Sequence, residues 1–320
     1  MQRVLTTVTL LGLLVATAAA FAITEHVKLE KSPIYGVQVS NGQQSGRRAQ
    51  PAVFSPVCDC PTKSATVRLR LRHTGHVTVT IVDSDHNKVA TIAPNVVMQA
   101  REPMTFPWDG RTDTGGLAPD GVYYPWIHLP RRTFKFINKI TLDTVPPQVV
   151  SAAGVKQKPV LFAGRGQSVA IRYALSEDAH PVVYLDGRRI TVGRHTRPSG
   201  KIKWAGKVDG RPLRAGSYVL SIGAVDPAGN ETPAGERKDV TVVLRYVELT
   251  PSVTTVRAGR PFKVHVETAA RRYTWRLGQR HGERRGRTLR LRAPTTPGTY
   301  RLVVTANGHA TTAVLRVHAK

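Results

Sequence analysis

Apolar and polar residues alternate over short runs through most of this chain. Val67, Leu69 and Leu71 are separated by arginines, and a second run repeats the pattern at Val77 and Val79. A period of two is typical of a β-strand that buries one face and leaves the other in water. After residue 25 no stretch keeps the three-and-four spacing of an amphipathic helix over three turns, and 27 glycines and 22 prolines interrupt the chain. The pattern predicts an all-β protein in which helix is a minor component.

The N-terminus is the exception, because an apolar run extends from Val4 to Ile23 behind Arg3. About 20 apolar residues are enough to cross the hydrocarbon core of a membrane as a helix. The small residues Ala20 and Ala22 also fit a signal-peptidase site. We therefore expect residues 1–23 to be either a signal peptide cleaved near Ala22 or an uncleaved signal-anchor helix. Both alternatives place residues 24 onward outside the cytoplasm.

Composition divides the rest of the chain into a linker and three modules. Residues 24–52 are polar and rich in turn-forming residues, which is typical of a linker. The paired prolines Pro146 and Pro147 hold the backbone extended and block ladder pairing, so we expect a stiff junction there. The predicted modules span 53–146, 147–246 and 247–320, and each has the length of one sandwich domain.

A short Gly-x-Tyr signature recurs near the end of each module, after a turn and before an alternating strand. Its copies are Gly121-Val122-Tyr123, Gly216-Ser217-Tyr218 and Gly298-Thr299-Tyr300. In the first two modules a tryptophan precedes the signature, in Trp108-Asp109-Gly110 and in Trp204-Ala205-Gly206.

We expect the glycine of the signature to allow a tight turn, and the tyrosine to enter the core while its hydroxyl reaches back to a loop carbonyl. This is the tyrosine corner of immunoglobulin-like (Ig-like) sandwiches. The predicted fold is therefore a tandem of Ig-like or fibronectin-like β-sandwiches. We expect Trp108 and Trp204 to fill the cores; the alternative is an exposed platform on which sugars stack.

The stretch 106–124 resembles a known module. Its Trp108-Asp109-Gly110, Pro119 and Gly121-Val122-Tyr123 match the spacing of the W-D/N-G-x-D-x-x-G-x-x-x-P-x-G-x-Y pattern in the Ig-like domain of flagellar hook-capping proteins. The second module is a divergent copy, with Ala205 in place of the acidic residue, and the third has the Gly-x-Tyr element alone. The resemblance implies an exported bacterial protein whose modules act as spacers and binding platforms, and it implies no cofactor.

The only two cysteines, Cys58 and Cys60, are one residue apart. An oxidising compartment favours a disulfide between them. Free or intermolecular thiols are one alternative, and a metal site is another. No further cysteine or histidine lies close to the pair in the sequence, which disfavours a metal.

The chain carries 47 Lys and Arg against 21 Asp and Glu, a formal net charge of +26, and from 247 to 320 fifteen basic residues face three acidic ones. Leu289 and Leu291 alternate with Arg290 and Arg292, so a strand there would bury leucines and show guanidiniums on one outer face. Guanidiniums bind phosphate and carboxylate in bidentate fashion. The candidate polyanion-binding residues are Arg271, Arg272, Arg276, Arg280, Arg284, Arg285, Arg287, Arg290 and Arg292. The alternative is that these side chains only solvate the outer faces of strands.

No catalytic or cofactor motif is present: the sequence has no helical zinc-protease pair, nucleophile elbow, phosphate loop or dinucleotide fingerprint. Asp109, Asp113 and Asp120 lie close enough in sequence to suggest a calcium site. Aspartates in such loops usually cap turns, however, so we predict no metal site. The chain is therefore not expected to be an enzyme.

The leading hypothesis is a non-catalytic cell-envelope protein, structural or adhesive, whose third module binds anionic envelope polymers or lipid headgroups and no specific nucleic acid. The alternative is an accessory, protein-binding component of an envelope enzyme or transport complex.

Overall fold

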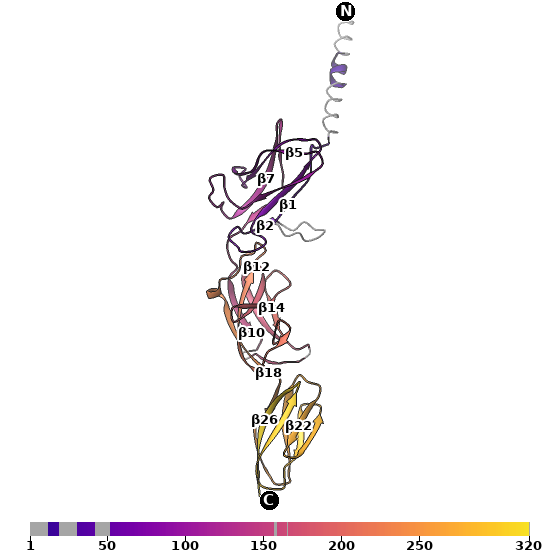
Figure 1. Ribbon diagram of the computed structural model, residues 1–320, viewed down its shortest axis with the longest axis vertical. Coiled ribbons are helices and arrows are strands. Elements are labelled where there is room, and N and C mark those ends of the chain that lie inside the picture. Colours follow the sequence, from indigo (N-terminus) through magenta and orange to yellow (C-terminus); the bar gives the residue numbers. More distant parts are fainter. Residues whose placement is uncertain (1–11, 19–30, 42–51, 157–158, 165, 320) are drawn as a thin grey trace, which may run out of the picture. The chain divides into compact units, whose positions relative to one another are not determined.

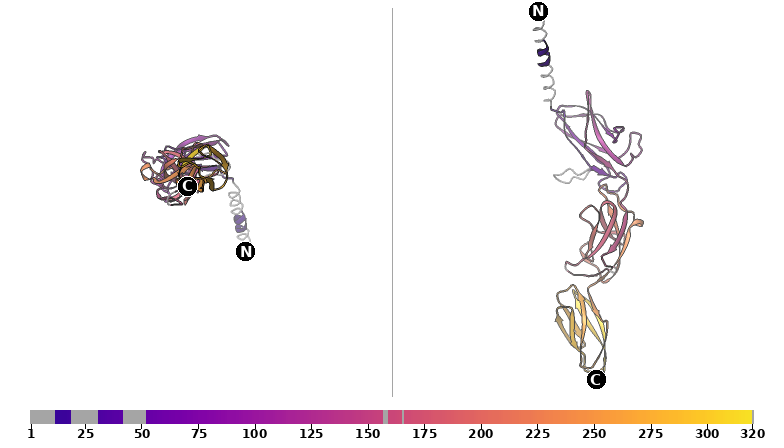
Figure 2. Two further views of the ribbon diagram at one scale, coloured as in Figure 1. Left: turned by 90° about the horizontal axis from the view of Figure 1, so that it is seen from below. Right: turned by 180° about the vertical axis from the view of Figure 1, so that it is seen from behind.

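The computed structural model describes residues 12–18, 31–41, 52–156, 159–164 and 166–319. Strands dominate this part of the chain, and the helical segments in it are 12–18 and one short 3-10 turn, Ala234–Glu236 (Figures 1 and 2). The prediction of an all-β protein is confirmed. No helix among these residues is long and apolar enough to span a bilayer. The rest of the predicted export segment, residues 1–11 and 19–23, lies outside the described residues.

The chain forms two compact units, Met1–Asp143 and Thr144–Lys320. The first unit holds one apolar core, which we call the first module. The second unit holds two cores, which run from Val149 to Tyr246 and from Val247 to Val317, and which we call the second and third modules.

The first module is built from two layers. One sheet has the strand order β1-β3-β6, and the other has the order β2-β9-β7-β4-β5 with β8 paired to β7. The strands are β1 Ile34–Ser40, β2 Ala52–Phe54, β3 Ala65–Leu71, β4 Gly75–Val82, β5 Lys88–Met98, β6 Pro103–Trp108, β7 Gly121–Leu129, β8 Arg132–Lys135 and β9 Ile140–Leu142.

Strand β1 corrects the prediction that residues 24–52 are a linker. It pairs antiparallel with β3, Ile34 is buried, and Val37 and Val39 pack against the first core. The signal was present, since Val37 and Val39 flank a polar residue at strand spacing. The turn-forming residues that follow outweighed three apolar side chains in the sequence pattern. Residues 42–51 lie outside the described part of the chain.

In the second module one long strand belongs to both layers. The first part of β12 pairs with β10 and β14, and its last part pairs with β13 and β17; a register irregularity separates the two parts, between Ala174 and Ala179. β17, β18 and β11 complete the second layer. The strands are β10 Val149–Gly154, β11 Val160–Phe162, β12 Val169–Leu185, β13 Arg188–Val192, β14 Arg197–Trp204, β15 Lys207–Val208, β16 Arg211–Pro212, β17 Gly216–Val225 and β18 Lys238–Arg245.

The third module is a two-layer sandwich of eight described strands. A three-stranded sheet has the order β19-β21-β24, and a five-stranded sheet has the order β20-β26-β25-β22-β23. The strands are β19 Val247–Thr250, β20 Val253–Arg257, β21 Pro261–Thr268, β22 Tyr273–Leu277, β23 Arg280–Arg284, β24 Thr288–Arg292, β25 Gly298–Ala306 and β26 His309–His318.

All three modules share one unusual pairing. A short early strand runs parallel to the last strand of its module, as β2 does to β9, β11 to β18 and β20 to β26. Antiparallel hairpins alone cannot produce such a pair, because parallel neighbours need a crossover between the layers. The chain is therefore a tandem of Ig-like β-sandwiches with a repeated topology.

The tyrosine of the Gly-x-Tyr signature makes the same hydrogen bond in all three modules. The hydroxyls of Tyr123, Tyr218 and Tyr300 each donate to the carbonyl four residues upstream, at 2.5, 2.8 and 2.8 Å. Trp108 and Trp204 are 2% and 1% exposed, and each indole N–H donates to the carbonyl three residues on. Each indole also meets the tyrosine of its module edge to face. These tryptophans are core residues and present no face to a sugar.

The glycine that needs its backbone freedom is the one after the tryptophan. Gly110 and Gly206 have φ angles of +81° and +71°. A Cβ on Gly110 would lie 3.0 Å from Leu142 and from Pro56. Gly121 does not have a positive φ, and a Cβ there would meet Tyr123 at an ordinary 3.9 Å. The expected tight entry is thus made at Gly110, eleven residues before the position that the sequence pattern suggested.

We expect Gly110→Ala to destabilise the first module by about 1–3 kcal/mol, because alanine would be strained at this φ and would collide with the core. Gly121→Ala is the matched control and should change the free energy of unfolding by less than about 1 kcal/mol. Denaturant unfolding of the full chain measures both. Equal losses in the two variants would contradict this assignment of the turn.

Candidate functional site

The structure joins Cys58 and Cys60 in a disulfide, with Cα atoms 5.2 Å apart. The bond lies in the loop between β2 and β3. There the Cys60 sulfur is 3.0 Å from the Thr62 hydroxyl, and the backbone N–H of Ser55 donates to the carbonyl of Thr62. These contacts close the loop on itself, so we assign the pair a local structural role.

The aspartates considered for calcium are engaged by the protein in the Trp-Asp-Gly loop. Asp109 accepts a hydrogen bond from the backbone N–H of Arg111. Asp113 accepts one from the backbone N–H of Thr91 and pairs with Lys88 at 2.7 Å, and these contacts lower its pKa. Both carboxylates serve as turn and strand anchors.

The nine candidate arginines do not form one patch. Arg276 lies on the outer face of the five-stranded sheet, opposite His281. Arg271 and Arg272 lie in the loop before β22, and Arg272 pairs with Glu283 at 3.0 Å. Arg272 is thus neutralised by a carboxylate, and Arg276 lies on the opposite outer face of the sandwich from Arg290 and Arg292.

The other six line one edge of the third module, which we call the arginine edge: Arg280, Arg284, Arg285, Arg287, Arg290 and Arg292. β23 and β24 are the edge strands of the two sheets and are consecutive in the chain. The turn 285–287 joins them at one end, and the Arg280 guanidinium donates to the Arg292 carbonyl at 2.8 Å at the other. All six side chains are exposed, and none forms an ion pair with the part of the chain that the structure describes.

The arginine edge continues onto the outer face of the three-stranded sheet. Leu289 and Leu291 are buried and Arg290 and Arg292 are exposed, as the alternation indicated. The register places Lys263 of β21 directly opposite Arg290.

In the next row of this face, His265 stands between Thr288 of β24 and Thr250 of β19. A pocket of 320 Å³, which we call the basic pocket, is lined by Pro251 and by the side chains of Thr250, Lys263, His265, Thr288 and Arg290.

Sequence reasoning missed Lys263 and His265, although a signal for them existed. Phe262, Val264 and Val266 alternate with polar residues and are buried, so the strand and its outer face could be read directly. What the sequence could not supply was the pairing partner, because β21 and β24 are some 20 residues apart with two strands between them. Only the register brings Lys263 and Arg290 together.

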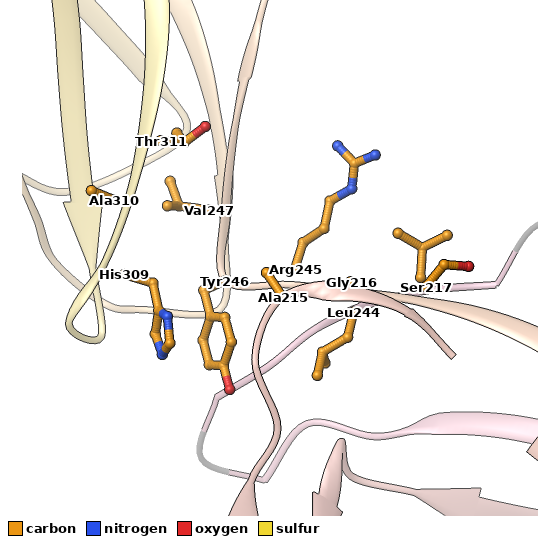
Figure 3. A pocket seen from close by; sticks show the side chains of 11 residues that line it. Ala215, Gly216, Ser217, Leu244, Arg245, Tyr246, Val247, His309, Ala310 and Thr311 are labelled. Carbon is orange, nitrogen blue, oxygen red and sulfur yellow. The ribbon is translucent and has the colours of Figure 1, made fainter. Parts of the chain in front are cut away.

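A larger concavity of 440 Å³ lies between the second and third cores (Figure 3). The rings of Tyr246 and His309 stack there with centroids 3.5 Å apart. The Tyr246 hydroxyl donates to the Leu213 carbonyl at 2.5 Å, and Arg245, which points away from the two rings, pairs with Glu248. The ionisable groups of this concavity are thus held in contacts that link the two modules.

A third group of charges surrounds Glu231 in the second module. Its carboxylate accepts hydrogen bonds from the Tyr184 hydroxyl and from Arg189, and it pairs with Arg237 at 3.1 Å. The Arg237 guanidinium also lies 3.6 Å from the centre of the buried Tyr184 ring. Burial alone would raise the pKa of Glu231, but the hydrogen bonds and charges of these partners outweigh it and lower that pKa. The cluster is internally satisfied and joins β12, β13 and the loop after β17.

Comparison with known proteins finds tandem Ig domains among the solved structures at low sequence identity. No protein-family model matches the sequence, and no curated protein matches it. A titin segment of three Ig domains, in a mutated form, is 11% identical over 91% of this chain and 100% of that one, with a TM-score of 0.30. Another titin tandem is 11% identical over 80% and 94%, with a TM-score of 0.35. The polymeric Ig receptor ectodomain of a teleost fish is 10% identical over 53% and 99%, with a TM-score of 0.31.

The Glu231 cluster predicts an acid-sensitive contribution to stability. Because the folded-state pKa of Glu231 is lowered, its stabilisation is present above the unfolded-state pKa, about 4.5, and is lost as the pH falls through the folded-state value. We expect Glu231→Gln to cost about 1–3 kcal/mol at pH 7, because it leaves Arg237 and Tyr184 poorly partnered. The difference from wild type should shrink towards pH 3. The exposed Glu236→Gln is the control and should change little; a Glu231→Gln difference that is constant from pH 7 to pH 3 would contradict the prediction.

Proposed function

We propose that this chain is a non-catalytic, exported protein whose third module binds an anionic polymer along the arginine edge. A tandem of Ig-like sandwiches is a structural or binding module. The proposal adds the ligand class, and the observation that carries it is the row of six exposed guanidiniums on two consecutive edge strands and the turn that joins them. The resemblance of residues 106–124 to the hook-capping Ig-like domain supports an exported bacterial protein in which the first two modules act as spacers.

The arginine edge concentrates positive charge at a cost to folding. Like charges placed close together repel, and exposed cations are usually interspersed with anions. The third module has three acidic residues, and two of them, Glu248 and Glu283, already pair with arginines outside the edge. A polyanion that neutralises several guanidiniums would offset this repulsion and release counterions.

A polymer fits this surface better than a membrane does. Proteins that insert into the interface of a bilayer present aromatic or large aliphatic side chains beside their cations. Val253 is the one large apolar side chain exposed in the described part of the third module, and it lies on β20 of the other sheet. The arginine edge offers charge and hydrogen-bond donors alone.

The absence of catalysis is also part of the proposal. Its support is that the ionisable groups around the 440 Å³ concavity and around Glu231 are held in structural contacts.

The arginine edge is tested with long-chain inorganic polyphosphate as the probe. Replacing Arg280, Arg284, Arg285 and Arg287 with glutamine should weaken binding at least tenfold at low salt. It should also reduce the slope of log Kd against log salt by about 3, if each lost contact releases its share of counterions. Fluorescence titration of the full chain at four salt concentrations gives both quantities.

The matched control removes the same net charge elsewhere in the module, by replacing Arg257, Arg260, Arg301 and Arg316 with glutamine. This control should retain most of the affinity. If the two quadruple variants lose equal affinity, net charge and not the arginine edge is responsible. Stronger binding to anionic phospholipid vesicles than to polyphosphate would overturn the polymer in favour of a membrane surface.

Export is tested separately by fractionating the native protein and sequencing its N-terminus. A start at Ile23 outside the cytoplasm indicates release after cleavage, and an intact Met1 in the membrane fraction indicates anchoring. An intact Met1 in the cytosol would contradict export.

A further inference from the structure

We propose that the basic pocket is a specific seat for a single phosphate group of the polymer, held by Lys263, His265 and Arg290. This inference rests on the proposed function and makes it sharper: the arginine edge attracts any polyanion, whereas the basic pocket selects phosphate. Lys263 and His265 lie outside the arginine edge, and Arg290 belongs to both the edge and the pocket.

The register of the three-stranded sheet brings hydrogen-bond donors from β19, β21 and β24 to one place. Lys263 and Arg290 are direct cross-strand neighbours, and His265 has Thr288 on one side and Thr250 on the other. Directly opposed residues on one face of a sheet have Cβ atoms about 4.5–5.5 Å apart. An ammonium, a guanidinium, an imidazole and two hydroxyls therefore surround a space of 320 Å³. That volume lies at the small end of the range for ligand pockets, which begins at about 300 Å³.

The donors of the basic pocket are unused by the protein. The structure gives the side chains of Lys263, His265, Thr288, Arg290 and Thr250 no hydrogen bond or ion pair within the described chain. Elsewhere in the second unit exposed arginines do find carboxylates, as Arg188 does with Asp209. A Lys directly opposite an Arg is an unfavourable cross-strand pair. An anion between them would turn this repulsion into two attractive contacts.

The other charges of this face determine which way a chain would run through the pocket. Glu267 follows His265 on β21 and lies opposite Glu248, so one end of the face is acidic. Arg292 lies at the other end, opposite Pro261. A polyanion seated in the basic pocket is thus repelled from the acidic end and led along β24 towards Arg292.

Phosphate matches this donor set better than carboxylate does. A guanidinium grips two oxygens of either group in a bidentate pair. A carboxylate then has no further oxygen, whereas a phosphate group attached to the polymer through one oxygen keeps a third non-bridging oxygen at another position of the tetrahedron. Lys263 and His265 lie on the neighbouring strand, where such oxygens can be reached. The pocket volume beyond the phosphate accommodates the attached chain.

The test follows the imidazole of His265 by nuclear magnetic resonance in the full chain labelled at its histidines, with inorganic phosphate as the probe at fixed pH and ionic strength. Comparison with His265→Gln identifies the signal. We expect it to shift saturably with phosphate and to stay unchanged with acetate. Lys263→Gln should weaken phosphate binding about fivefold to tenfold, the effect of losing one charge-assisted hydrogen bond. Arg290→Lys keeps the charge but removes the bidentate pair of donors, so it should weaken phosphate binding as well.

Arg257→Gln, on the five-stranded sheet, is the control and should leave the phosphate titration unchanged. Equal shifts with phosphate and acetate, or full affinity in Arg290→Lys and Lys263→Gln, would overturn the phosphate seat. If polyphosphate still binds through the arginine edge in that case, the proposed function stands and this inference alone fails. If polyphosphate does not bind either, both fail.

Discussion

The strands that line the cores bury alternate side chains, and in β21 and β24 of the third module this period of two determines which face each charged residue occupies. Leu289 and Leu291 are 1% and 7% exposed, so the residues between and after them must face water. The same holds for Lys263 and His265 between the buried Phe262, Val264 and Val266. A one-residue slip of either strand would bury guanidiniums and ammonium groups at a cost of several kcal/mol each. The burial of these apolar residues therefore also determines which charged side chains face water.

The alternation also explains how much could be predicted from the sequence. The strand 288–292, its buried leucines and its exposed arginines follow from local pattern, and so do the all-β class and the buried Trp108 and Trp204. Register does not, because it depends on residues far apart in the chain. The opposition of Lys263 and Arg290 and the separation of Arg276 from the arginine edge needed the structure.

Two further differences have equally local physical reasons. β1 was hidden because its few apolar side chains precede a stretch rich in turn-forming residues. The sequence pattern assigned the tight turn to Gly121, whereas the positive φ angle lies at Gly110. A recurring glycine marks a repeated position in the chain. Its recurrence does not say whether a positive φ or a close contact requires the glycine. At Gly121 the tyrosine two residues on covers the backbone at ordinary contact distance. The repeated sequence identified the motif, but the φ angles were needed to distinguish the roles of Gly110 and Gly121.

The three modules share the parallel pairing of an early strand with the last strand, and they differ in the contacts that their cations make. In the first, Lys135 lies 4.2 Å from the centre of the Trp126 ring, and Lys88 pairs with Asp113. In the second, Arg237 meets both Tyr184 and Glu231. In the third, one ion pair joins a cation and a carboxylate of the module within the described chain, that of Arg272 with Glu283. Exposed cations without an ion pair in the described chain, such as Arg68 and Lys203, also occur in the first two modules. The third module differs in placing six arginines on two consecutive edge strands and the turn that joins them.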